Sequence, residues 1–88
     1  MREVLVNGVP RVIRSEAIYR HFKFPEKKHP FYIVMGFAKD STTENEMVIY
    51  RNIGGNKGAW VRSLEEFSSE VDREKYPDAR QKYRFQEV

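Results

Sequence analysis

The stretch Phe31-Tyr-Ile-Val-Met-Gly-Phe-Ala38 decides the fold class, because it is apolar on both faces and lies between a charged, proline-bounded segment and a run of polar residues. A short apolar run between turn residues is typical of a strand that is buried on both sides. We therefore expect this stretch to be the central strand of a sheet. Gly36 inside it predicts a bulge or a sharp bend.

The residues around this run have the pattern of further short strands joined by turns. Asn7-Gly8 separates two β-branched runs and is the strongest local signal of a hairpin with a type I′ turn. Pro10 lacks the backbone N–H of a ladder donor, so we expect its strand to pair on one side only. Other strands are expected at 17–24, 47–51, 59–62 and 83–88, with turns at 40–45 and 54–58 and a charged loop at 25–30.

One helical turn is expected near the carboxyl terminus. Ser63 and Glu66 have the spacing of a capping box, in which each side chain accepts a hydrogen bond from the backbone N–H of the other residue. Leu64, Phe67 and Val71 follow at helical spacing. Together the elements predict an all-β protein, a small barrel or roll, because closing a short sheet removes its unpaired edges.

Length and composition exclude several classes of protein. A chain of 88 residues allows one small domain with a thin core, and zero cysteines exclude a disulfide scaffold, thiolate chemistry and a cysteine-based zinc site. The apolar run at 31–38 is too short to cross a bilayer and the chain does not begin as a signal peptide does, so we expect a cytoplasmic protein with no membrane partner. The net charge of +3 is concentrated in the first 28 residues, which makes it weak evidence for nucleic-acid binding.

Several motifs resemble, in order and spacing, a bacterial and phage family catalogued as domain of unknown function 1653. They are Ile18-Tyr-Arg-His-Phe-Lys23, Tyr32-Ile-Val-Met-Gly36, Met47-Val-Ile-Tyr-Arg51, Trp60-Val-Arg62 with Leu64 and Phe67, and Arg84-Phe85. The chain departs from the family pattern at Asp40, Ser63 and Glu66, where the family has histidine, proline and methionine. The resemblance implies an SH3-like β-barrel domain at 17–88, leaves 1–16 as an added amino-terminal hairpin, and implies no established function.

Catalytic and metal chemistry find little support in the sequence. The two histidines are His21 and His29, and neither belongs to a recognisable set of nucleophile, base and orienting carboxylate. Two distant histidines and scattered carboxylates do not make a metal site. The glycine-rich segment 54–58 lacks the Gly-Lys-Ser/Thr ending of a phosphate loop, so a hairpin turn is favoured there. We expect no catalytic residues, no cofactor and no metal.

The candidate binding site is a set of arginines, aromatic side chains and one histidine. Its members are Arg20, His21, Tyr50, Arg51, Trp60 and Arg62. Arginine offers a planar fork of donors for phosphate or carboxylate, and tryptophan or tyrosine offers a stacking face, so the set suits a planar anionic ligand. The alternative is that the tyrosines and Trp60 fill the thin core while the arginine stems cover its rim.

The sequence therefore favours a non-enzymatic binding module for nucleic acid or a nucleotide-like small molecule, including a phage-type protein that sequesters a nucleotide. The alternative is a protein-interaction adaptor that uses the barrel or the edge of the hairpin. An enzyme that uses His21 as a general base comes third. A homodimer is compatible with each function, because a thin core gains from a shared interface.

Overall fold

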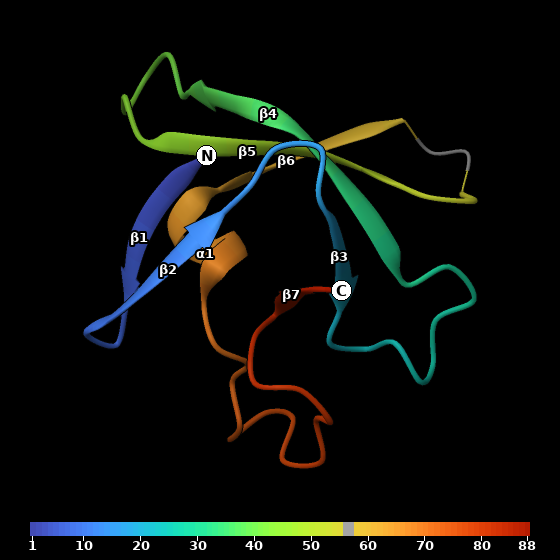
Figure 1. The fold of residues 1–88 in the computed structure, drawn as a ribbon. Helices are drawn as coiled ribbons and strands as arrows, with labels where there is room; N and C mark the ends of the chain where they lie inside the picture. Colours follow the sequence, from blue (N-terminus) through green and yellow to red (C-terminus); the bar gives the residue numbers. More distant parts are fainter. Residues whose placement is uncertain (56–57) are drawn as a thin grey trace.

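A computed structural model describes residues 1–55 and 58–88 of the chain (Figure 1). In chain order the elements are β1 (Arg2–Val6), β2 (Val9–Ile13), β3 (Ile18–His21), β4 (Phe31–Lys39), β5 (Glu46–Asn52), β6 (Ala59–Ser63), α1 (Leu64–Ser68) and β7 (Phe85–Glu87). The prediction of an all-β fold with a short helix near the carboxyl terminus is confirmed. The turn expected at 54–58 contains Asn56 and Lys57, which lie outside the described residues.

The strands form two antiparallel sheets, a hairpin of β1 and β2 and a five-stranded sheet in the order β6-β5-β4-β3-β7. As expected, β4 is the central strand. Among residues 1–55 and 58–88 the strands do not close into a barrel. Instead, α1 and the hairpin lie on one side of the five-stranded sheet, as Figure 1 shows. We call this side the covered face and the opposite side the bare face.

The hairpin forms as its turn sequence predicts. Asn7 and Gly8 have φ angles of 50° and 79°, the left-handed conformation that a type I′ turn needs at both central positions. Pro10 pairs with Leu5 and with no second strand, since this sheet has only two strands. Ile13 is fully buried in the main core, so the hairpin is part of the packed structure.

The bulge expected at Gly36 is present in β4. The pairing with β5 shifts between Val34, which lies opposite Tyr50, and Gly36, which lies opposite Ile49. The shift inserts one extra residue, Met35, and returns Phe37 to the covered face beside Val34. The apolar side chains of one long strand therefore follow the curved core.

The helix begins at its predicted cap but is shorter than predicted. The Ser63 hydroxyl accepts the backbone N–H of Glu66 at 3.1 Å, whereas the Glu66 carboxylate pairs with Arg62 and does not complete the capping box. The helix ends at Ser68 and not near Val71, because Ser69 is extended and Glu70 bridges Tyr83. Within the described residues, no helix has the length and apolar character needed to cross a membrane.

Two strands are also shorter than the sequence predicted. β3 ends at His21 and does not continue to residue 24, because the backbone N–H of Phe24 turns back to the carbonyl of His21 at 3.0 Å. β7 covers only Phe85–Glu87 of the expected 83–88, since Arg84 donates its backbone N–H to Ser69. A local turn thus ends β3, whereas the residues before β7 pair with the segment that follows α1.

The core is a cluster of aromatic rings on the covered face. Its members are Ile13, Tyr19, Tyr32, Val34, Val48, Tyr50, Leu64, Phe67 and Phe85. Phe67 of α1 and Phe85 of β7 stack with ring centroids 4.3 Å apart and planes 7° from parallel. Tyr19 and Tyr50 pack around this pair at 5.2 to 5.5 Å. Aromatic rings bury a large area per residue, which suits so short a chain.

The hairpin's place in the core leads to a stability prediction. Replacing the fully buried Ile13 by alanine should lower the free energy of unfolding by about 2–5 kcal/mol, the cost of a cavity in a packed core. The neighbouring exposed Val12→Ala is the matched control and should cost less than about 1 kcal/mol. Urea denaturation of the three proteins measures both values, and equal losses would show that the hairpin is not packed as described.

Candidate functional site

A groove opens on the covered face where β6 and the segment after β3 meet the edge of the core. It holds a cavity of about 200 Å³ lined by His21, Lys27, Tyr32, Tyr50, Trp60, Arg62 and Phe85. A second cavity of about 260 Å³ shares Lys27, Tyr32 and Trp60 with the first and adds Lys28, His29, Asn52 and Gly55. We call these two neighbouring cavities the Trp60 groove.

The floor of the Trp60 groove is the aromatic core itself. Tyr32, Tyr50 and Phe85 are buried, and their ring centroids lie 5.3 to 5.6 Å from one another with mostly edge-to-face geometry. Trp60 lies directly across from Tyr50 in the β5–β6 pairing and is 45% exposed. The groove therefore has a fixed apolar floor and one accessible indole.

Arg62 forms one wall of the groove. It lies two residues after Trp60 on β6, so both side chains are on the same face of the sheet. Its Nε donates a hydrogen bond to the Tyr50 hydroxyl at 2.9 Å, and its Nη1 pairs with the carboxylate of Glu66. Nη2 makes no hydrogen bond within the described part of the chain, so one side of the guanidinium remains available.

Lysines from the segment between β3 and β4 form the opposite wall. Lys27 Nζ donates to the Tyr32 hydroxyl at 3.2 Å and lies 5.8 Å from the centroid of the same ring. Lys28 lines the second cavity. None of the described lining residues is acidic, so the Trp60 groove carries positive charge on both walls.

His21 lies in the groove as a neutral donor. Its side chain is only 8% exposed, and its Nδ1 accepts the backbone N–H of Lys23 at 3.1 Å. Burial, together with the positive charges of Lys27 and Arg62, lowers the pKa of His21 to about 3. The ring is therefore uncharged near neutral pH, and with Nδ1 accepting, its proton is on Nε2.

Several groove residues belong to the sequence motifs quoted above, and a family model covers all of these motifs. A family model described as "Protein of unknown function (DUF1653)" matches residues 17–87. The chain belongs to the DUF1653 family. Comparison of this DUF1653 protein with curated proteins and with solved structures gives no match. The hairpin before residue 17 lies outside the matched residues.

The groove brings together four of the six residues expected in the site: His21, Tyr50, Trp60 and Arg62. Arg20 lies on the bare face, where its Nε donates to Gln81 at 3.0 Å and its guanidinium lies 3.9 Å from the Phe24 ring centroid. Arg51 is exposed on the bare face between Ile33 and Ala59. The DUF1653 fold thus divides the arginines between two faces.

The sequence analysis missed three lining residues of the first cavity, Lys27, Tyr32 and Phe85, and the four that line only the second cavity. Tyr32 and Phe85 belong to quoted motifs, and pairing β3 with both β4 and β7 is what brings them beside His21. Lys27 lies in a charged loop, where nothing local distinguishes it from Lys28. Among the described residues, no group of three or more His, Asp or Glu side chains converges to hold a metal ion.

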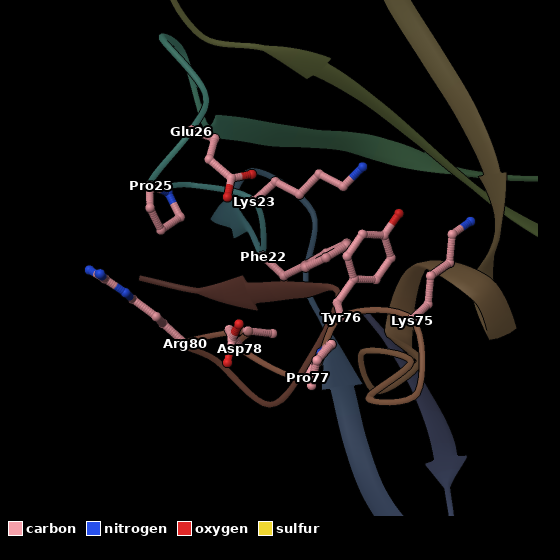
Figure 2. A pocket seen from close by; sticks show the side chains of 10 residues that line it. Phe22, Lys23, Pro25, Glu26, Lys75, Tyr76, Pro77, Asp78 and Arg80 are labelled. Atoms are coloured by element: carbon pink, nitrogen blue, oxygen red, sulfur yellow. The ribbon is translucent and has the colours of Figure 1, made fainter.

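A second hollow lies between the segment after β3 and the loop at 75–80, and Figure 2 shows it. Phe22 and Tyr76 form its apolar base with ring centroids 4.8 Å apart, and Lys23 and Lys75 lie beside the Tyr76 ring. Glu26, Asp78 and Arg80 also line this cavity of about 240 Å³. Its charges are mixed in sign, so it selects an anion less clearly than the Trp60 groove does.

The lowered pKa of His21 leads to a prediction about pH. The unfolded chain takes up a proton at this residue near pH 6.5 but the folded chain only near pH 3, so the stabilising contribution is complete above about pH 6.5 and is lost as the pH falls toward 3. As the pH falls through this window, the free energy of unfolding should decrease more steeply for the native protein than for His21→Gln. The difference between the two slopes should reach up to about 1.4 kcal/mol per pH unit. Urea denaturation across the window measures the slopes.

Nuclear magnetic resonance of the His21 ring provides the direct check on the same prediction. The ring carbon-bound protons should keep the shifts of a neutral imidazole down to about pH 4. A His21 titration midpoint near the ordinary value of about 6.5 would contradict the described burial.

Proposed function

We propose that the Trp60 groove binds a nucleotide-like ligand, in which a planar ring is joined to phosphate. The observation that carries the proposal is an accessible indole set between cationic walls with no acidic lining residue among those described. Trp60 supplies the stacking face for the planar ring. Stacking of a base on an aromatic side chain is worth about 1–3 kcal/mol.

The phosphate would lie against Lys27, Lys28 and Arg62. The pair between Arg62 and Glu66 is half exposed on the glutamate side, so it contributes little to stability and a phosphate can compete for the guanidinium. The same positive field that lowers the pKa of His21 stabilises an anion placed beside it. His21 adds a neutral N–H donor at the base of the groove.

The size of the groove favours a small molecule over a nucleic-acid strand. The two neighbouring cavities of about 200 and 260 Å³ are each smaller than the roughly 300–1000 Å³ of ligand pockets. A strand-binding surface follows about four or more nucleotides. Arg20 and Arg51 lie on the bare face and therefore do not extend the cationic surface of the groove.

Binding without chemistry is the simplest use of this groove. A histidine with a pKa of about 3 is poorly matched to general-base catalysis near neutral pH, because its driving force for accepting a proton is small. We therefore favour a module that holds or sequesters its ligand, as phage proteins that capture nucleotide signals do, over an enzyme.

Fluorescence of Trp60, the single tryptophan, tests the proposal. Adenosine monophosphate and diphosphate should quench it in a saturable way, whereas adenosine should bind at least about tenfold more weakly because it lacks the charged group. Lys27→Gln should weaken nucleotide binding by about tenfold or more, and the matched variant Arg51→Gln on the bare face should leave it within about twofold.

Two results would count against the nucleotide proposal. One is the absence of saturable quenching by either nucleotide. The other is preferential binding of a single-stranded oligonucleotide with an affinity that falls steeply with salt, which would assign the groove to nucleic acid.

A second candidate function, that of a protein-interaction adaptor, rests on the hairpin. Leu5 is 69% exposed beside Pro10, and both outer edges of this two-stranded sheet are unpaired. Removing the hairpin would also remove the buried Ile13, so a surface change is the sharper probe. If the hairpin is the docking edge, Leu5→Glu should abolish capture of a protein partner while nucleotide quenching of Trp60 is unchanged.

A further inference from the structure

The bare face of the five-stranded sheet is apolar over most of its area. Side chains that share it through the strand pairing are Ile18, Phe31, Ile33, Met35, Met47, Ile49, Val61 and Val88. Five of them (Ile18, Phe31, Met35, Val61 and Val88) are between 39% and 63% exposed. No described helix or strand packs on this face. Among residues 1–55 and 58–88, the contacts on this face are at its corner, where Phe24 and Gln81 cover Arg20.

The sequence of β4 is that of a strand with both faces buried. Antiparallel sheets with one solvated face usually alternate apolar and polar residues, whereas strands covered on both sides are apolar throughout. In β4, Tyr32, Val34 and Phe37 point to the covered face while Phe31 and Ile33 point to the bare face. The strand is therefore apolar on a side that the single chain leaves exposed.

The exposed area is that of a small, weak interface. The accessible surface of 6038 Å² exceeds the roughly 5400 Å² expected for a folded chain of 10.5 kDa. Strands β3 to β6 have 4, 9, 7 and 5 residues, and a rise of about 3.3 Å and a strand spacing of about 4.8 Å give them a face of roughly 400 Å². Two such faces bury about 800 Å², which is in the range of weak and reversible interfaces below roughly 1200 Å².

Charge identifies a second copy of this chain as the occupant. Arg51 is exposed at one end of the face, and none of the described carboxylates pairs with it. Asp40 and Glu44 lie at the opposite end, in the turn between β4 and β5. A two-fold axis that lies in the interface and across the strands reverses the strand direction of the second copy. It places Arg51 of each copy against the acidic turn of the other.

We infer that the protein is a homodimer in which the bare faces of two copies pack on each other with reversed strand direction. Ile33, Ile49 and Val61 form the apolar centre, and Arg51 pairs with the turn at 40–45 of the second copy at either end. Aligned packing of two sheets at about −30° leaves the Trp60 groove of each copy open, because the groove is on the covered face. The inference does not depend on what the groove binds.

Sedimentation velocity and light scattering of the full chain test this inference. The native protein should be a dimer at micromolar concentration. Val61→Glu should raise the dissociation constant by at least about a hundredfold, because two-fold symmetry buries the unpaired carboxylate twice. Leu5→Glu is the matched control, because Leu5 is an exposed apolar residue on the hairpin (69% exposed against 57% for Val61), and it should remain dimeric. Circular dichroism and urea midpoints confirm that both variants fold.

A charge exchange tests the orientation of the two copies. Arg51→Glu and Glu44→Lys should each weaken the dimer, and the double variant should recover most of the lost affinity. Loss without recovery would overturn the reversed orientation. A native protein that stays monomeric at high micromolar concentration, or a Val61→Glu variant that dimerises as tightly as the native chain, would overturn the inference. Dissociation by Leu5→Glu alone would do the same, by assigning the interface to the hairpin.

Discussion

The stack between Phe67 and Phe85 is the contact on which the rest of the structure depends. Phe67 comes from the single helix and Phe85 from the last strand, and their rings lie 4.3 Å apart at the centre of the core. Tyr19 and Tyr50 pack against this pair from neighbouring strands of the sheet. An 88-residue chain has material for one such layer, so α1 and the hairpin lie on the same side of the sheet, the side to which Phe85 of β7 points.

The candidate site uses the rim of this same core. Tyr32 and Tyr50 bury their rings and direct their hydroxyls outward, where the first accepts from Lys27 and the second from Arg62. Each tyrosine therefore packs the interior with one end and positions a cation with the other. The core and the groove share side chains, so the groove charges are held in place by packing and need no separate supporting shell.

The alternation of side chains along a strand explains how much of the site the sequence could predict. Trp60 and Arg62 are two residues apart and must share a face, as the structure shows. Tyr50 and Arg51 are adjacent in one strand, so the rule that placed the first in the core also placed the second on the opposite side. Arg20 and His21 separate for the same reason. The motifs were identified correctly, but adjacency in sequence was taken as proximity in space.

Strand order and loop placement were not available from the local sequence. The hairpin turn, the bulge at Gly36 and the helix cap at Ser63 each depend on a few neighbouring residues, and the structure confirms all three. The position of Lys27 in the groove depends on contact between a loop and the distant strand β6. Lys27 and Trp60 meet because β4 and β5 pair in sequence between the loop and β6, and no local pattern specifies that arrangement.

The sequence of β4 is apolar on both faces, although the core of one chain packs on one face of the strand. The pattern predicted burial on both faces, and the described residues of the chain cover one of them. The extra residue at the bulge, Met35, also adds an apolar side chain to the bare face. A solvated face would tolerate polar residues at these positions without cost to the core, because nothing packs there. The homodimer inferred above would account for their apolar character, because its interface covers the bare face and so buries both sides of β4.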